Sequence, residues 1–236
     1  MDNATFLKAL HVLSPKYADN VLFKFFMEKK HRQIHKWLHY FPIYDKWFKD
    51  FRGTDLVFVE IGVNQGGSLQ MWKDYFGKDA KIIGIDIDER CKQLEEDQIT
   101  VEIGSQEDVE FWNNFKKKYP RVDILLDDGG HTMKQQIVTF TQMFPHVKDG
   151  GIYICEDCHT SYWKSYGGGL KNPNSYIEFT KTLIDQINAF YTGGAVSPNY
   201  FTTNIGGIHF YDSIVVVEKS LVPLVPLDLT KGKPSF

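Results

Sequence analysis

The sequence predicts a doubly wound α/β fold: a mainly parallel sheet that closes with an antiparallel hairpin and is preceded by N-terminal helices. Three observations predict it. Beyond residue 53, short β-branched runs alternate with helical patterns, which is typical of βαβ units. The runs are apolar throughout rather than alternating, as expected of strands covered on both faces. Finally, two strand-like runs, Gly207–Tyr211 and Ser213–Glu218, follow each other so closely that they indicate a hairpin.

The residues before the sheet predict helices. A short amphipathic segment is expected over Phe6–Leu13, and a longer helix from about Tyr17 to Trp37, where apolar residues recur near helical spacing. Pro42 punctuates the end of that helix. We therefore expect an N-terminal helical segment over residues 1–53 and a single sheet-containing domain over residues 54–236.

Five strands of this domain are expected to be parallel, with their carboxyl ends at one edge of the sheet. They are Leu56–Ile61, Lys81–Asp86, Thr100–Ile103, Asp123–Leu126 and Gly151–Cys155. Helical patterns separate and follow them near residues 68–75, 89–96, 107–118, 133–144 and 175–190.

Composition narrows the class of protein. The 236 residues are 42% hydrophobic, which is enough for one medium domain with a core. A net charge of −3 gives no overall attraction to nucleic acid or anionic lipid, and no apolar run approaches the roughly 20 residues of a membrane helix. The first residues lack the layout of a secretory signal, and three cysteines make no disulfide framework. We expect a cytoplasmic protein with no nucleic-acid or membrane partner.

The segment Val59–Ser68 ends the first strand and opens a helix, at the edge where such sheets bind ligands. Its glycines allow a sharp turn and close approach of a ligand. Asn64 stands where a dinucleotide fingerprint has its second glycine, which weakens the case for a pyrophosphate cofactor. The pattern of Glu60, Gly62 and Gly66 instead suits a phosphate-free cofactor whose cationic amino acid moiety faces Glu60. A plain tight turn is the alternative.

Polar residues at the ends of the next two strands extend this cofactor site. Asp86, ~20 residues after the glycine loop, is placed to accept ribose hydroxyls, although an N-cap before Glu89 is the alternative. Ser105, Gln106 and Asp108 follow the third strand, where an adenine ring would lie, and a helix cap is their alternative. The predicted cofactor-binding residues are Glu60, Gly62, Asn64, Gly66, Ser68, Asp86, Ser105, Gln106 and Asp127.

Four carboxylates follow the fourth and fifth strands, Asp127 and Asp128 on one and Glu156 and Asp157 on the other. Adjacent carboxylates repel, and a hard divalent cation such as Mg²⁺ relieves the repulsion through oxygen ligands. We predict Asp128, Glu156 and Asp157 as metal ligands, with N-caps and salt bridges as the alternative. His131, just beyond, is predicted to act with Asp128 in catalysis as the base that takes a proton from an attacking hydroxyl. A capping or salt-bridged histidine is its alternative.

Two further groups carry weaker signals. His31, His35 and His39 recur at helical spacing, which is conceivable for a soft metal, but a solvated face that includes Lys36 is the plainer interpretation. Tyr162, Trp163 and Tyr166 precede three glycines, which suggests a mobile flap whose rings contact a sugar or apolar substrate. A surface loop with no role is the alternative for the flap.

Over roughly residues 54–219 the sequence resembles the metal-dependent sugar O-methyltransferases, among them the macrocin, mycinamicin and rhamnosyl O-methyltransferases. The most specific pieces are the run Asp127-Asp128-Gly-Gly-His131, the pair Glu156-Asp157 with the aromatic segment after it, and Phe210–Val215. Five parallel strands followed by a hairpin also match the Rossmann-like class I methyltransferase sheet better than the all-parallel dehydrogenase sheet.

The resemblance implies an S-adenosylmethionine-dependent methyltransferase domain over residues 54–236. It implies a divalent metal at Asp128, Glu156 and Asp157, with His131 as the base that activates a sugar hydroxyl. Glu60, Gly62 and Asp86 then fall at cofactor positions. The residues before the sheet do not match the larger N-terminal portions of some relatives. The sugar-containing acceptor and a homo-oligomer through the N-terminal helices are therefore left open.

Other functions remain to be weighed. A metal-independent methyltransferase acting on another small molecule would keep its activity under full chelation. A nicotinamide-dependent oxidoreductase would bind NADH tightly, although the missing second glycine and the hairpin speak against it. A non-catalytic binding module would retain its function after Asp128→Ala or His131→Ala, but it explains the carboxylates and the histidine poorly.

Overall fold

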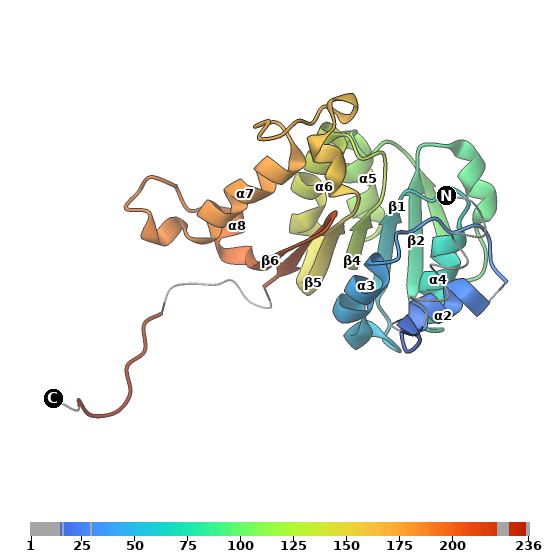
Figure 1. Ribbon diagram of the computed structural model, residues 1–236, viewed down its shortest axis with the longest axis horizontal. Helices are drawn as coiled ribbons and strands as arrows, with labels where there is room; N and C mark the ends of the chain where they lie inside the picture. The colour runs from blue at the N-terminus through green and yellow to red at the C-terminus, as the bar shows by residue number, and fades with distance from the viewer. Residues whose placement is uncertain (1–14, 16, 29, 221–226, 235–236) are drawn as a thin grey trace.

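The structure, a computed structural model, describes residues 15, 17–28, 30–220 and 227–234. Within these residues seven strands form one sheet in the order β3-β2-β1-β4-β5-β7-β6, and most of them are labelled in Figure 1. The strands are β1 (Val57–Ile61), β2 (Lys81–Asp86), β3 (Ile99–Ile103), β4 (Val122–Asp127), β5 (Val147–Cys155), β6 (Ile205–Tyr211) and β7 (Ile214–Lys219). Every predicted strand is present, with ends shifted by a few residues.

Strands β1 to β5 are mutually parallel, and β7 runs antiparallel to both β5 and β6. The hairpin turns at Asp212-Ser213, where Ser213 has a φ of +65°. The predicted fold class, a doubly wound, mainly parallel sheet with a terminal antiparallel hairpin, is therefore confirmed. Because the strand order reverses between β1 and β4, their carboxyl ends form the crevice in which such sheets bind ligands.

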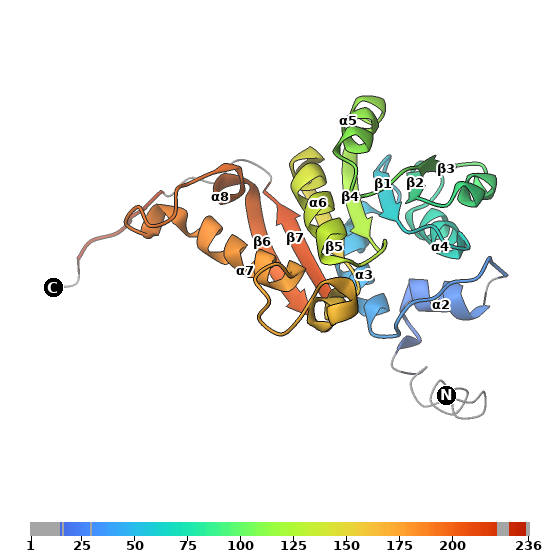
Figure 2. The same cartoon turned by 90° about the horizontal axis from the view of Figure 1, so that it is seen from above.

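Helices cover both faces of the sheet (Figure 2). The α-helices are α2 (Val21–Glu28), α3 (Tyr40–Phe48), α4 (Gly67–Phe76), α5 (Val109–Lys118), α6 (Met133–Met143), α7 (Tyr176–Ile187) and α8 (Tyr200–Asn204). One hydrophobic cluster joins α2, α3 and α4 to one face, and a second joins α5, α6 and α7 to the other. Burial on both faces explains why the central strands are apolar throughout: every residue of β1 and β4 is buried.

Short 3₁₀ helices connect these elements. They are η1 (Lys49–Phe51), η2 (Glu89–Leu94), η3 (Phe144–His146), η4 (Cys158–Tyr162), η5 (Lys164–Tyr166) and η6 (Ala189–Tyr191). The helix expected near residues 89–96 is thus a 3₁₀ helix, whose N-cap Asp88 accepts a hydrogen bond from the Arg90 amide.

The N-terminal helix expected from Tyr17 to Trp37 is wrong in its second half. Helix α2 ends at Glu28, and residues 31–37 have no regular structure. This segment bonds to other parts of the chain instead: the Arg32 amide donates to the side chain of Gln70, at 2.9 Å. Tertiary contacts therefore override the helical spacing of the sequence. The expected segment Phe6–Leu13 lies outside the described residues.

The same error misplaced Pro42 and the histidines. Pro42 does not end a helix but lies in the first turn of α3. Backbone N–H groups have no partner within the helix at that position, so the missing N–H of proline costs nothing there. His31 and His35 lie in the irregular segment and His39 caps α3, so the three share no helical face. The division of the chain at residues 53 and 54 stays a prediction.

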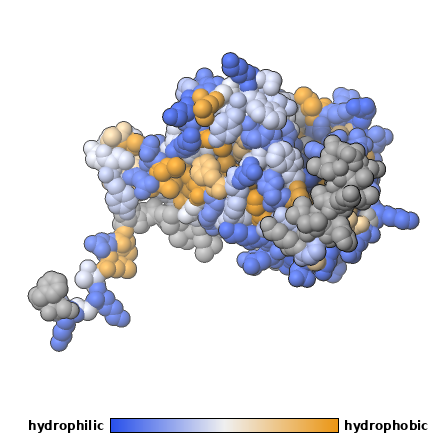
Figure 3. Space-filling view, viewed as in Figure 1, coloured by the Kyte–Doolittle hydropathy of each residue, from blue (hydrophilic) through white to orange (hydrophobic). Residues whose placement is uncertain are grey.

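The surface is mixed, with apolar side chains scattered among polar ones on the face shown in Figure 3. Residues 227–234 are exposed and extend away from the body of the molecule (Figure 1). Within the described ranges, no helix combines the length and apolar character that crossing a membrane requires.

Candidate functional site

A cavity of about 330 Å³ lies at the carboxyl ends of β1, β2 and β4, within the size range of small-ligand sites. The predicted site residues that line it are Gly62, Asn64, Asp86, Ser105, Gln106, Asp128, His131, Glu156 and Asp157. The cofactor candidates Glu60, Gly66, Ser68 and Asp127 do not line it. The structure thus brings most of the predicted cofactor, metal and catalytic residues to one place.

The glycines of the β1–α4 loop make room for the protein's own backbone. A Cβ on Gly62, whose φ is +94°, would lie 2.0 Å from the carbonyl oxygen of Asp128. A Cβ on Gly67 would lie 2.2 Å from the carbonyl oxygen of Arg32. No side chain could tolerate either distance. Glycine at position 62 therefore lets the loop after β4 pack closely, and glycine at position 67 does the same for the irregular N-terminal segment. At these two positions the close approach expected of a ligand is made by the chain itself.

Asp86 fixes the shape of the same loop. Its Oδ2 accepts hydrogen bonds from the Val63 and Asn64 amides, at 2.9 and 3.1 Å, and its Oδ1 accepts one from the Asp88 amide, at 2.9 Å. Asp88, not Asp86, caps the following helix, so the N-cap alternative for Asp86 is wrong. A carboxylate has about four acceptor positions, which leaves Asp86 able to accept from a ligand in the cavity.

Gln106 links the loops after β3 and β4. Its Nε2 donates to Asp127 Oδ1 and Thr139 Oγ1, each at 3.0 Å, and its Oε1 accepts from the Gly130 amide at 2.8 Å. Burial raises the pKa of Asp127 to about 6, although the Gln106 bond works in the opposite direction. The cap of α5 is Asp108. Asp127 is therefore placed beneath the cavity wall, where it orients Gln106.

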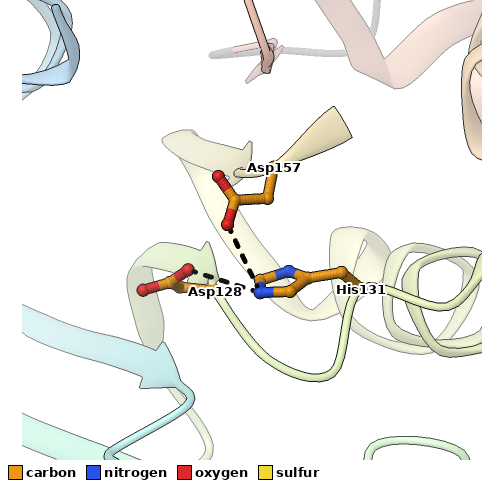
Figure 4. Close-up of side chains that lie close together, drawn as sticks. All are labelled: Asp128, His131 and Asp157. Carbon is orange, nitrogen blue, oxygen red and sulfur yellow. Dashed lines mark ion pairs between the residues drawn. The ribbon is translucent and has the colours of Figure 1, made fainter. Parts of the chain in front are cut away.

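Asp128, His131 and Asp157 line the cavity, and their side chains converge (Figure 4). His131 Nε2 lies 3.5 Å from Asp157 Oδ2 and 3.9 Å from Asp128 Oδ1. One ligand atom from each of the three lies within 4.8 Å of the others. His131 and Asp157 have φ values of +59° and +51°, a strained conformation that often marks functional sites.

The second nitrogen of His131 strengthens the case for a ligand here. Its Nδ1 is buried and has no hydrogen-bond partner among the residues that the structure describes. A buried polar atom without a partner costs free energy unless a bound group satisfies it. Oxygen ligands from Asp128 and Asp157 suit a hard divalent cation, so these side chains fit a metal of that kind.

Glu156, the third predicted metal ligand, is held by other side chains. The Tyr44 hydroxyl donates to its Oε1 at 2.5 Å, and Lys36 Nζ lies 3.1 Å from each of its two oxygens. Burial and the neighbouring Asp128 raise the pKa of Glu156, while Lys36 and Tyr44 oppose that rise. Asp157, by contrast, accepts from the Tyr40 hydroxyl at 2.7 Å through Oδ1 and keeps Oδ2 facing His131.

The position of Lys36 was also predicted wrongly from the sequence. It was expected on a solvated face, but its side chain is only 2% exposed. Its ammonium lies 2.6 Å from Asp128 Oδ2, 3.1 Å from Glu156 and 3.3 Å from Glu60 Oε1. Burial alone would lower its pKa, but the three carboxylates overcome burial and hold the pKa well above 10.5. The lysine is therefore charged.

Glu60 lies below the cavity, fully buried. Its Oε2 accepts from the Ser68 hydroxyl at 2.7 Å, so these two predicted cofactor residues bind each other. Burial raises the pKa of Glu60, whereas Lys36 lowers it. The cation that faces Glu60 in this structure is thus Lys36, where the amino group of a cofactor was expected.

His35, Trp37 and Tyr40 also line the cavity and were not predicted to. The only sequence signal that could have found them is the density of aromatic and basic residues before the sheet. The expected substrate residues lie elsewhere: Tyr162 and Trp163 are about half exposed outside the cavity, and Tyr166 lines a second pocket between the flap and α6 and α7. The Trp163 ring contacts His159, and His159 stacks on Trp37 in the cavity wall.

The chain is similar to known methyltransferases. A family model described as a methyltransferase domain matches residues 59–158, which include the glycine loop and both carboxylate pairs. Mycinamicin VI 2''-O-methyltransferase of Micromonospora griseorubida is 36% identical over 195 residues, 77% of this chain and 48% of the relative. Demethylmacrocin O-methyltransferase of Streptomyces fradiae is 33% identical over 201 residues, 79% of this chain and 50% of the relative.

Solved structures agree in fold. The MycE methyltransferase from the mycinamycin pathway, in complex with Mg, SAH and mycinamycin VI, aligns with a TM-score of 0.74 and 34% identity. The alignment covers 85% of this chain and 52% of that one. The sheet is therefore the Rossmann-like class I methyltransferase sheet. The chain spans about half the length of the curated relatives that it matches.

Proposed function

We propose that this chain, whose residues 59–158 match a methyltransferase-domain family model, transfers a methyl group from S-adenosylmethionine to a sugar hydroxyl with the help of a divalent metal such as Mg²⁺. The observation that carries the proposal is the convergence of Asp128, His131 and Asp157 in the lining of a cavity that Gly62 and Asp86 also line. A relative named as an O-methyltransferase of a rhamnosyl tetracenomycin, 33% identical over 196 residues, supports the choice of acceptor class.

In the proposed reaction the hydroxyl oxygen attacks the methyl carbon of the sulfonium. The carbon–sulfur bond breaks, its electron pair stays on sulfur, and S-adenosylhomocysteine leaves as a neutral thioether. The hydroxyl proton goes to His131 Nε2, where Asp157 at 3.5 Å stabilises the resulting imidazolium. Holding the oxygen, carbon and sulfur in line supplies much of the rate, which gives the cavity walls a positioning role.

Several of the remaining predicted residues are also assigned roles in this proposal. Asp86 accepts from the ribose, and Ser105 and Gln106 lie beside the adenine. Asp128, Glu156 and Asp157 would hold the metal, which when bound orients and acidifies neighbouring hydroxyls. Tyr162, Trp163 and Tyr166 contact the acceptor at the outer side of the site.

Calorimetric titration tests the cofactor half of this proposal. We expect micromolar binding of S-adenosylmethionine and S-adenosylhomocysteine by the whole chain in Mg²⁺. Transfer of labelled methyl to a panel of glycosides and nucleotide sugars tests the acceptor, with EDTA to remove the metal. An Asp79→Asn variant, changed at an exposed position far from the cavity, serves as the control. No cofactor binding by folded protein would overturn the proposal.

One alternative has an observation in its favour. Because Lys36 already offsets part of the negative charge of Asp128 and Glu156, a methyltransferase that needs no metal is the second candidate function. Transfer that persists unchanged in EDTA would select it. A cytoplasmic location, the absence of nucleic-acid and membrane partners, and a homo-oligomer through the N-terminal helices remain part of the proposal. Light scattering of the purified chain tests the last of these.

A further inference from the structure

The ammonium of Lys36 is bound by the same oxygens that were predicted to bind the metal. It contacts Asp128 Oδ2 at 2.6 Å and both oxygens of Glu156 at 3.1 Å. Glu156 has its other close partner in Tyr44, at 2.5 Å, and both its oxygens are therefore engaged. A metal bound by Asp128 and Glu156 together needs acceptor positions that the lysine now uses.

The two cations cannot share these oxygens at their preferred distances. Mg²⁺ draws its oxygen ligands to 2.0–2.1 Å and tolerates little distortion. An ammonium 2.6 to 3.1 Å from the same atoms would lie within a few ångströms of the ion, where two positive charges repel strongly in a buried site. A metal that takes Asp128 Oδ2 and Glu156 must therefore displace the ammonium, whereas Asp128 Oδ1 faces His131.

We propose that Lys36 is a built-in competitor for the metal, which sets the affinity of the carboxylate cluster for divalent cations. This inference rests on the proposed function, because it takes Asp128 and Glu156 as metal ligands. It assigns to an N-terminal residue, outside the sheet, the control of a site that the ends of β4 and β5 build.

The contacts on either side of Lys36 hold its segment in place when the side chain releases Asp128 and Glu156. Arg32 anchors one end, through Gln70 at 2.9 Å and the Leu94 carbonyl at 2.8 Å. Tyr40 anchors the other end from α3, with its hydroxyl on Asp157. Between these anchors the four-carbon side chain of Lys36 can rotate, and Glu60 already offers it a further carboxylate at 3.3 Å. A rotation of the Lys36 side chain toward Glu60 would free Asp128 and Glu156 for the metal.

Lys36 also has a function before the metal arrives. Glu60, Asp128 and Glu156 are three carboxylates in contact with one ammonium, and Glu60 and Glu156 are almost completely buried. Removing the ammonium from metal-free protein leaves buried charges without a partner, which is strongly destabilising. A metal would replace the missing charge. Loss of the lysine should thus weaken the metal-free protein and strengthen metal binding at the same time.

The test is calorimetric titration of Mg²⁺ into the wild-type chain, Lys36→Met and Lys36→Gln, with Lys30→Met as the matched control at an exposed position of the same segment. We expect Mg²⁺ to bind both Lys36 variants at least ~10-fold more tightly than it binds wild type and the control. In EDTA the melting temperature of both variants should fall by roughly 5–15 °C, and Mg²⁺ should restore it. If Lys36→Met does not fold, the glutamine variant, which keeps a hydrogen-bond donor, carries the test.

Titration of S-adenosylhomocysteine in the same samples separates the two possible failures. Normal S-adenosylhomocysteine binding with equal or weaker Mg²⁺ affinity in both Lys36 variants overturns the competition and leaves the methyltransferase intact. Cofactor binding with no Mg²⁺ binding by any variant overturns both the competition and the metal requirement. Absence of cofactor binding from folded wild type overturns the proposed function itself. Mg²⁺ binding by the variants and not by wild type would be the strongest support.

Discussion

Strand β4 carries acidic residues at both its ends, and the two ends differ in how their charge is balanced. At the amino end, Asp123 is fully buried and accepts from the Val57 amide at 2.7 Å. Arg121 Nε at 2.9 Å and the ammonium of Lys148 complete its surroundings. At the carboxyl end, Glu60, Asp128 and Glu156 share the single ammonium of Lys36.

The difference teaches how to tell a structural carboxylate from a functional one. Two cations and an amide satisfy one carboxylate at the amino end, so nothing further is required there. At the carboxyl end negative charge exceeds positive charge, His131 Nδ1 lacks a partner, and the backbone of Asp157 is strained. Incomplete balance beside a cavity is the condition under which a bound ligand or metal is stabilising.

The sharpest way to break this comparison is His131→Ala. We expect turnover to fall ~100-fold or more, because the proposed base is lost, while S-adenosylhomocysteine binding stays unchanged. Steady-state kinetics and calorimetry measure the two effects. His146→Ala is the matched control, since His146 bonds to the Tyr119 carbonyl at the opposite edge of the sheet. Normal turnover by the His131 variant would refute its role as base.

Asp86→Ala should weaken S-adenosylhomocysteine binding roughly 30-fold, because the cofactor loses an acceptor and the Val63 and Asn64 amides lose theirs. The binding constant is measured by calorimetry. Asp88→Ala removes a neighbouring carboxylate that caps η2 and should leave the binding constant within about twofold. Equal losses in both variants would mean that the loop, not a cofactor contact, is responsible.

Asp123→Ala should lower the free energy of unfolding by about 1.5 kcal/mol, because a charged hydrogen bond to the Val57 amide is lost. Arg121 and Lys148 are each about two-fifths exposed and can turn to solvent, which limits the cost. Urea denaturation measures the loss. Cofactor binding and Mg²⁺ affinity should remain those of wild type, and a change in either would couple the two ends of β4.

Tyr162→Ala should have the smallest effect on the folded protein. Its side chain is half exposed, so the free energy of unfolding and the affinity for S-adenosylhomocysteine should change by no more than ~0.5 kcal/mol. The expected effect is a higher KM for the sugar acceptor, measured once an acceptor is found. An unchanged KM would place the acceptor away from the flap.

Features that depend on local sequence patterns were predicted correctly, and features that depend on contacts between distant residues were not. Strands β1 to β5 were predicted because their burial on both faces requires continuous apolar runs, and the hairpin because Asp212 and Ser213 turn the chain within two residues. Asp86, Asp128 and His131 could be placed at one edge because the carboxyl ends of parallel strands must meet there. The hydrogen-bond partners of Asp86 and the neighbours of Glu156 could not be predicted, because they depend on loop conformations.

By itself, the sequence determined the order of strands and helices and the gathering of carboxylates and one histidine at the ends of β4 and β5. Only the tertiary structure decided that residues 31–37 are not helical and that their backbone packs against Gly67. It also decided that Lys36 lies in the carboxylate cluster. The physical reason is that helical spacing is a local preference worth little per residue, whereas an ammonium among three buried carboxylates is fixed by charges distant in the chain.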